Sequence, residues 1–365
     1  MSRSVVITGV GLVSACGTTA DGHLASIDGA PTKPDRDVFT PHSVFRAAPV
    51  DFAETISSKS DRRQMEPWQL LGVTAAGFAL ESAGLAERDT REHLYLNVAA
   101  NGGAREVDVD MEVLADLHGT ADPEGALVGA LSRKLRPSFL LGQLSNMLAG
   151  NIAIVLGVGG GARTFMGDEM AGIEAVADAV ARIASGQSER VLVGGVQDAE
   201  RSDLFLSLAL GGLLSEGEVP PVLDPARTGQ TPGSIAAFLV LESGEAAQAR
   251  KAEAIAQLSP VTSAFGPGAV PACVQGLPSG DVSAILSAVS GVQPETLQVS
   301  EALQQAWPDA HMIATSDLAG HGGEAAFPFA IALSALMVQT KRAERAVSVG
   351  VYSDGAATAM LEAAR

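Results

Sequence analysis

The sequence predicts an α/β fold whose strands are buried and run parallel or in mixed directions. Short runs rich in Val, Ile and Leu alternate with longer segments in which apolar and small residues recur at helical spacing. A similar order of strands and helices occurs twice along the chain. The residues are 47% hydrophobic but only 4% aromatic, so Ala, Val, Leu and Ile must build the core. A chain of 365 residues suffices for one large domain or two ordinary ones.

The first half begins with an apolar strand and a glycine pair, Gly9 and Gly11, which we interpret as a turn. Glycines also end two of the helical patterns, at Gly84 and Gly186. In chain order the predicted elements are strand 4–10, helix 69–83, strand 94–100, helix 145–155, helix 171–185 and strand 190–193.

The second half begins near residue 234. Residues 259–279 are rich in Pro and Gly and predict a loop. The predicted elements are strand 235–242, helix 245–253, helix or strand at 281–290 and 297–307, helix 322–337, and a hairpin of 347–352 with 357–361. The two halves, 1–233 and 234–365, are therefore interpreted as an internal duplication, although no exact sequence repeat accompanies it.

Charge and composition limit the class of function. The formal net charge of −18 disfavours nucleic acid and anionic membranes as partners. It also disfavours acidic proteins, unless local basic patches offset the field. No apolar run reaches the roughly 18 residues of a membrane span, and the start of the chain does not resemble a signal peptide. Cys16 and Cys273 lack metal-type spacing, so we expect a cytoplasmic protein without a metal site.

Five sequence blocks resemble one family in its own order. They are 4–14 (SVVITGVGLVS), 190–195 (RVLVGG), 221–229 (PVLDPARTG) with the strand to 242, 319–326 (AGHGGEAA) and 349–353 (VGVYS). This pattern resembles β-ketoacyl-acyl-carrier-protein synthases of the synthase II type, in the thiolase superfamily. The resemblance implies a thiolase fold, in which duplicated halves form a five-layered αβαβα core, with dimerisation insertions in the first half. It implies no bound cofactor, since phosphopantetheine arrives with a carrier protein.

Glu169 occupies the position of the family's nucleophilic cysteine, counted back from Gly172, Gly186 and Gly194. In the family this cysteine attacks an acyl thioester from the head of a helix, where the helix dipole lowers the thiol pKa. A carboxylate there gains the same electrostatic benefit but is a poor nucleophile toward a thioester. The resemblance is therefore to a cysteine-less chain length factor.

The other positions of the family's site are also changed. His321 matches the second catalytic histidine, whereas Ser290 occupies the position of the first and Ser316 that of a lysine. Val351 and Tyr352 replace the family's Phe-Gly gate and are expected to line the pocket.

Two interpretations of the retained residues stay open. Glu169 either caps a helix N-terminus or shapes and acts in a pocket. His321 is either a retained catalytic group or a histidine satisfied in the interior.

Three functions follow from these interpretations. The first is a non-condensing subunit that pairs with an active ketosynthase, reaches a carrier protein through that complex, and takes part in polyketide or fatty-acid-type biosynthesis. The second is altered chemistry, such as malonyl-carrier-protein decarboxylation or acyl transfer, in which a protonated Glu169 orients a thioester carbonyl and His321 stabilises an enolate. The third is a purely structural scaffold.

Overall fold

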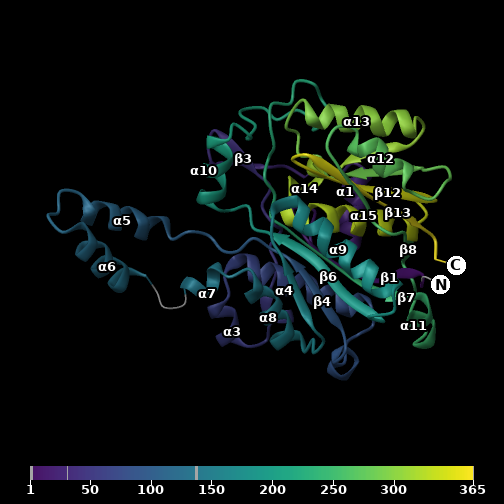
Figure 1. Cartoon of the computed structure of the whole chain (residues 1–365), viewed down its shortest axis with the longest axis horizontal. Coiled ribbons are helices and arrows are strands. Elements are labelled where there is room, and N and C mark those ends of the chain that lie inside the picture. The colour runs from purple at the N-terminus through teal and green to yellow at the C-terminus, as the bar shows by residue number, and fades with distance from the viewer. Residues whose placement is uncertain (1–2, 31, 136–138, 365) are drawn as a thin grey trace.

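Five layers of secondary structure make up the body of the molecule (Figure 1). The computed structural model describes residues 3–30, 32–135 and 139–364. Two helices, α9 (Asp168–Ala184) and α15 (Ala326–Gln339), lie between two sheets. Helices α4 (Pro67–Ser82) and α8 (Asn146–Leu156) cover the outer face of one sheet, and α12 (Ala269–Gln275) with α13 (Glu295–Ala306) covers the other.

The two sheets repeat one topology. The first has the order β5-β4-β6-β7-β1, in which β5, β4 and β6 are parallel and β7 and β1 are antiparallel to their neighbours. The second has the order β11-β10-β12-β13-β8 with the same directions. The bounds in the first sheet are β1 Val5–Val13, β4 Tyr95–Ala99, β5 Ala162–Phe165, β6 Arg190–Gln197 and β7 Ile235–Ser243. In the second they are β8 Ala256–Leu258, β10 Ala284–Ser287, β11 His311–Ala314, β12 Arg345–Tyr352 and β13 Gly355–Glu362.

The repeated strand order confirms the predicted α/β fold of two duplicated halves in five layers. It also moves the boundary between them. We expected the second half to start at residue 234, but β7 pairs with β1 and β6 and completes the first sheet. The second half therefore begins after Ser243 by topology. Strands β1 and β8 pair antiparallel and join the two sheets at their edges.

The predicted turn at residues 9–11 is wrong, because both glycines lie inside β1. A Cβ atom on Gly9 would lie 2.2 Å from the carbonyl oxygen of Ala79, and one on Gly11 would lie 2.0 Å from that of Ala75. The glycines therefore allow α4 to cross β1 at close range rather than reversing the chain. The predicted loop at 259–279 is wrong in part, since it contains β9 (Thr262–Phe265) and α12.

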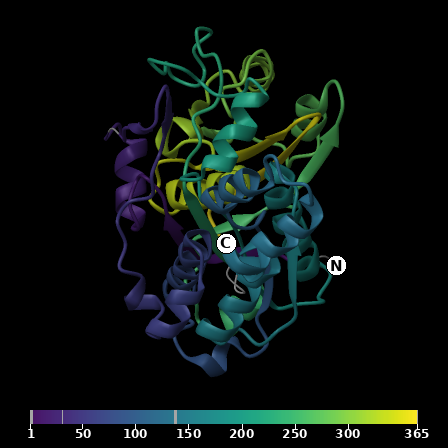
Figure 2. The same ribbon diagram turned by 90° about the vertical axis from the view of Figure 1, so that its left-hand side faces the viewer.

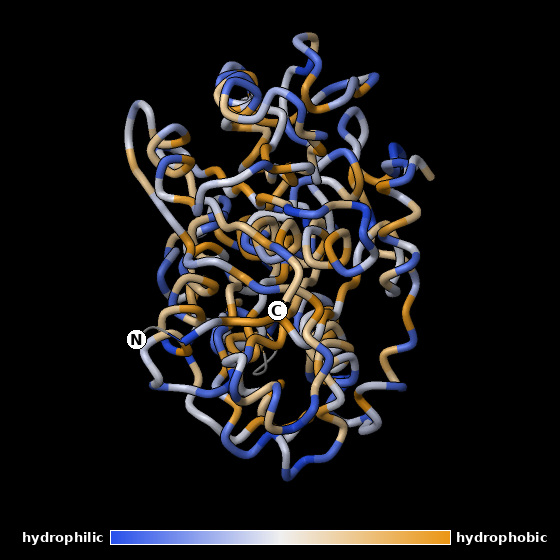
Figure 3. Tube along the Cα trace, turned by 90° about the vertical axis from the view of Figure 1, so that its right-hand side faces the viewer, coloured by the Kyte–Doolittle hydropathy of each residue, from blue (hydrophilic) through white to orange (hydrophobic). Residues whose placement is uncertain are grey.

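Small apolar residues fill the core, as the composition predicts. All residues of α15 from Ala326 to Val338 are buried, which explains why this helix is apolar on every side. Hydrophobic segments accordingly gather at the centre of the molecule and hydrophilic segments at its outer turns (Figure 3).

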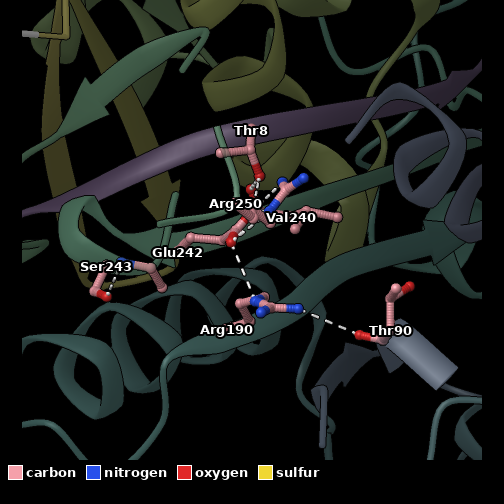
Figure 4. Close-up of polar contacts among 8 residues, drawn as sticks. Thr8, Thr90, Arg190, Val240, Glu242, Ser243 and Arg250 are labelled. Atoms are coloured by element: carbon pink, nitrogen blue, oxygen red, sulfur yellow. Dashed lines mark hydrogen bonds and ion pairs between the residues drawn. The ribbon is translucent and has the colours of Figure 1, made fainter. Parts of the chain in front are cut away.

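The buried carboxylate of Glu242 links β7 to neighbouring elements of the first half (Figure 4). Glu242 of β7 is fully buried, accepts a hydrogen bond from Thr8 of β1 at 2.6 Å and pairs with the guanidinium of Arg250. Arg190 of β6 lies 3.2 Å from its other oxygen. Because Glu242 is shielded from solvent, these hydrogen bonds and ion pairs supply the partners that a buried charge requires.

An arm made of α5 (Val107–Leu117) and α6 (Pro123–Lys134) projects from the body, whereas α7 (Phe139–Gln143) lies against the body (Figures 1 and 2). No element was predicted for these residues from the sequence. The exposed apolar residues on the arm are Val107, Met111, Leu114, Leu127 and Val128, and those on or next to α7 are Leu140, Leu141 and Leu144. Exposed apolar surface of this kind on a folded domain is typical of an interaction site.

Shorter elements complete the described chain. They are α1 Ala20–Ile27, β2 Asp35–Phe39, β3 His42–Val44, α2 Phe52–Thr55, α3 Lys59–Gln64, η1 Arg88–Arg91, α10 Ser202–Leu210, α11 Gly244–Ala249, α14 Thr315–Ala319 and η2 Gly323–Ala325. Among the described residues, no helix is long and apolar enough to cross a membrane. No group of His, Cys, Asp and Glu side chains in the same residues could hold a metal ion.

Candidate functional site

A sharp turn between β5 and α9 presents Glu169 at the head of a central helix. Gly167 and Asp168 both have positive φ, 129° and 49°, and such values are uncommon outside glycine. The turn brings the chain from the sheet edge into the helix within three residues. The first turn of α9 then carries two adjacent carboxylates, where the helix dipole favours negative charge.

Glu169 and His321 form the centre of the site. His321 Nε2 lies 2.7 Å from Glu169 Oε1, and the side chains are 5% and 28% exposed, respectively. Burial acts to raise the pKa of the Glu169 carboxyl, but the hydrogen bond and charge interaction with His321 outweigh it. The pKa of Glu169 therefore lies below its ordinary value. The hypothesis of a protonated Glu169 required the opposite shift.

The backbone on both sides of His321 is held firmly. Its N–H donates to Thr231 O at 2.8 Å, and its carbonyl oxygen accepts from Gln197 Nε2 at 2.8 Å and from the N–H of Gly233 at 2.9 Å. Its Nδ1 is buried and has no hydrogen-bond partner among the described residues. The geometry therefore favours the tautomer that carries hydrogen on Nε2 and donates it to Glu169.

A second buried glutamate, Glu324, lies beside this pair and was missed by the sequence analysis. It is 3% exposed and belongs to η2, whose backbone packs tightly between α9 and β6. A Cβ atom on Gly172 or Gly195 would lie 2.3 Å from the carbonyl oxygen of Glu324, so glycine is needed at both positions. A charged residue within the otherwise small and apolar stretch 322–333 was the available signal.

Burial raises the pKa of Glu324 to about 8, and the charges of Asp168 and Glu169 add to the effect. Burial likewise raises the pKa of Asp168, with Glu169 contributing. The site therefore holds an ionised Glu169 next to a Glu324 that keeps its proton at neutral pH.

A cavity of about 60 Å³ is lined in part by Asp168 and Glu324. We call it the Glu324 chamber. Its lining includes Trp68, Asn101, Asp168, Gln197, Arg201 and Glu324. Arg201 donates to Gly102 O at 2.8 Å and pairs with Asp203 at 2.6 Å. Both contacts hold its guanidinium in the wall of the chamber. A space of this size holds a few water molecules or a very small group, not an acyl chain.

The two serines at changed catalytic positions lie near one another but make no recorded contact with the central pair. Ser316 donates to Val289 O at 2.7 Å, and Ser290 Oγ accepts from the N–H of Val292 at 3.3 Å. Within the described ranges, no hydrogen bond joins Ser290 to Glu169 or His321. A catalytic role for Ser290 stays a prediction.

Val351 and Tyr352 end β12 at the tip of the hairpin. Tyr352 is 9% exposed, donates to Ala264 O at 3.1 Å and packs edge-on against Phe265. Val351 packs against the cluster of α12 and α13. These contacts fix both side chains within the second half, and their role as pocket residues stays a prediction.

The arrangement lacks a sulfur nucleophile. Cys16 Sγ donates to Leu318 O, and buried Cys273 donates to Ala356 O. The groups that remain are a carboxylate and an imidazole in hydrogen bond contact, which can accept, hold or donate a proton.

Comparison with known sequences identifies the relatives. Residues 2–247 match the model of the β-ketoacyl synthase N-terminal domain. The chain is 28% identical over 269 residues to 3-oxoacyl-[acyl-carrier-protein] synthase 2 of Vibrio cholerae, a match that covers 70% of this chain and 62% of that protein. It is 26% identical over 274 residues to the synthase 2 of Rhizobium meliloti, covering 70% and 63%. The match thus spans somewhat less than two thirds of the length of these relatives.

Comparison with solved structures gives the same fold. The ishigamide ketosynthase/chain length factor superposes with a TM-score of 0.82 at 20% identity, and a β-ketoacyl synthase from Burkholderia phymatum with 0.80 at 17%, both covering 100% of each chain. A type II polyketide ketosynthase in complex with its acyl-carrier protein gives 0.79 at 16% identity, again with full coverage. These similarities establish the thiolase-type fold.

Proposed function

Because this chain belongs to the β-ketoacyl synthase family, we propose that it is a non-condensing, chain-length-factor-like subunit that pairs with an active ketosynthase. The complex would act in polyketide or fatty-acid-type biosynthesis. A carrier protein would deliver the substrate on phosphopantetheine, and this chain would need no cofactor of its own. We place the complex in the cytoplasm.

The contact between Glu169 and His321 carries this proposal. Motif spacing predicts that Glu169 stands at the position of the family's cysteine, and the contact ties His321 to an ionised carboxylate. Thioester exchange requires a thiolate or an equally good nucleophile, and a carboxylate hydrogen-bonded to imidazole is a weaker one. The site therefore supports retention of the scaffold without condensation.

The surface supports a partner. Strand β5 forms one edge of the sheet, and an uncovered edge is a ready surface for pairing with another chain. Exposed apolar residues on the arm, at Met166 just after β5 and at Ile154 within α8 add apolar surface that a partner could cover. The net charge of this chain is −18. The basic groups that bind an acidic carrier protein would therefore come from the partner.

Reconstitution tests the proposal. An active ketosynthase from the same organism is supplied with carrier protein and malonyl units, with and without this chain. We expect this chain alone to form no product, and its addition to change the length or yield of the ketosynthase product. Condensation by this chain alone, or a product unaffected by its addition, would contradict the proposal.

A second candidate is malonyl-carrier-protein decarboxylation or acyl transfer at Glu169 and His321. It is favoured by the partial exposure of the Glu169 side chain, 28%, beside a histidine that can exchange protons. Since Glu169 is ionised, it would act as a base rather than as a donor to a carbonyl. Malonyl carrier protein incubated with this chain, alone and with its partner, would yield acetyl carrier protein; no such product in either case excludes the candidate.

A further inference from the structure

Glycines surround His321, so its own segment does little to fix the position of its imidazole. Gly320 precedes it and Gly322 and Gly323 follow it, and φ is 78° at Gly320 and 47° at Gly323. Glycine adopts such conformations readily, but it leaves the backbone less restrained than any other residue does. The position of the imidazole must therefore be set by contacts with other elements.

The segment of residues 231–233 makes one set of these contacts. The N–H of His321 donates to Thr231 O at 2.8 Å, and the N–H of Gly233 donates to His321 O at 2.9 Å, which forms an isolated parallel bridge at Pro232. Arg227, which is 4% exposed, holds this segment in turn by donating to Thr231 Oγ1 at 3.0 Å. A single bridge is shorter than any strand of the two sheets, so a further anchor matters at this point.

Gln197, the last residue of β6, supplies that anchor. Its Nε2 donates to His321 O at 2.8 Å and to Gly233 O at 3.2 Å. An amide nitrogen carries two hydrogens, and both partners are carbonyl oxygens, so these partners also fix which end of the amide is the nitrogen. One side chain thus ties together both sides of the bridge.

The oxygen of the same amide also lies against the His321 segment. A Cβ atom on Gly323 would lie 2.2 Å from Gln197 Oε1, so the oxygen rests on the backbone two residues beyond His321. The amide therefore contacts this segment at two points, the carbonyl group of His321 and the backbone of Gly323.

We propose that Gln197 is a positioning residue that holds the imidazole of His321 against Glu169. The contacts run from Gln197 Nε2 to His321 O, and from His321 Nε2 to Glu169 Oε1 at 2.7 Å. Since a hydrogen bond weakens steeply as its distance and angle depart from their optimum, a displaced His321 backbone would carry the ring away from the carboxylate. The inference holds whichever proposed function is correct, because it concerns this contact and not a product.

Hydrogen exchange measured by NMR on the intact wild-type chain tests the anchor itself. The side-chain N–H protons of Gln197 should exchange with water about tenfold more slowly, or slower still, than those of Gln187, whose side chain is exposed. Equal exchange rates for the two amides would overturn the proposal.

Replacing Gln197 tests its effect on the pair. Gln197→Met keeps the length of the side chain and removes both donors, whereas Gln197→Glu also places a carboxylate against two carbonyl oxygens. The Nε2–H proton of His321, identified by its loss in His321→Gln, should exchange about tenfold faster in Gln197→Met and faster again in Gln197→Glu. Gln143→Met is the matched control, since it removes one hydrogen bond to Ala104 O, at 2.6 Å, and should leave the His321 proton unchanged.

Backbone amides in the middle of α15 separate positioning from a general loss of stability. A positioning role predicts unchanged exchange at these amides together with faster exchange at His321 Nε2. Equal acceleration at both places, or a His321 proton that is unaffected in Gln197→Met, would overturn the proposal. If Gln197→Met fails to fold, the wild-type comparison of Gln197 with Gln187 decides it.

Discussion

At the scale of single residues, the site is governed by which carboxyl group holds a proton. Glu169 has a hydrogen-bond donor in His321, and this contact lowers its pKa despite burial. Oε1 of Glu324 has no hydrogen-bond partner among the described residues, and burial raises the pKa of this carboxyl group. Two glutamates in one site thus adopt opposite states because their surroundings differ.

Replacing Glu169 with cysteine should restore a thiol but not condensation. A thiol at the head of α9 lies in the positive field of the helix and should react quickly with iodoacetamide at neutral pH. Cys16, whose pKa is raised by burial, should react more slowly and serves as the internal control. Mass spectrometry measures alkylation, and a malonyl condensation assay measures activity. Since the motif alignment predicts Ser290 at the first histidine position, recovered condensation in the Glu169→Cys variant would contradict this account.

Replacing Glu324 with glutamine should change how stability depends on pH. The pKa of Glu324 is about 8 when folded and near 4.5 when unfolded, so between these values the unfolded chain has released a proton that the native protein retains. Stability from this group is therefore complete below pH 4.5 and is lost as the pH rises to about 8, at no more than about 1.4 kcal/mol per pH unit.

We thus expect Glu324→Gln to gain stability relative to the wild type as the pH rises from 5 to 8. Urea unfolding of both proteins at several pH values measures this difference and cancels contributions from other groups. A difference that does not change with pH would show that Glu324 is ionised throughout.

At the scale of elements, the fold depends on the close approach of α4 to β1 and on the buried ion network around Glu242. Gly9 and Gly11 admit α4 against β1, a role that sequence spacing does not distinguish from a turn. Helix α15 could be predicted because every side is apolar. The assignment of β7 to the first sheet could not be predicted, because its pairing with β1 joins residues more than two hundred positions apart in the sequence.

Removing the Glu242 carboxylate should destabilise the first sheet strongly. Glu242→Ala leaves Arg190 and Arg250 without their shared buried partner, so a loss of about 3–5 kcal/mol in the free energy of unfolding is expected. Glu245→Ala is the matched control, since its pair with Arg3 is exposed and should contribute less than about 1 kcal/mol. Chemical denaturation measures both. Equal effects of the two substitutions would refute the structural role of the network.

At the scale of the whole molecule, the family resemblance read from the sequence predicted the layers, and motif spacing singled out Glu169 and His321 as candidate site residues. Motif spacing predicts the positions of Glu169 and His321. It does not predict their contact, because that contact forms only when β5, α9 and η2 converge in the folded chain. Glu324 lies in a segment whose neighbours are small and apolar, so its burial becomes evident only when Gly172 and Gly195 are seen to face it. In α5 the exposed apolar residues Val107, Met111 and Leu114 recur at helical spacing, a pattern that on its own predicts a buried face, so their exposure becomes evident only in the folded chain.

Those outward residues connect the molecule to its proposed role. An apolar arm and a sheet edge at β5 are what a subunit needs if its function is exercised through a partner. Two glutamates in place of the exposed apolar Met111 and Leu114 would weaken the contact with the partner only if α5 contributes to it, and this gives a variant for the decisive test.

Native mass spectrometry of this chain mixed with an active ketosynthase from the same organism tests the central claim most directly. We predict a one-to-one heterodimer, which Met111→Glu with Leu114→Glu on α5 weakens at least tenfold, while Val38→Glu, exposed on β2 away from the arm, leaves it unchanged. A stable homodimer of this chain that does not exchange with the ketosynthase would contradict the account.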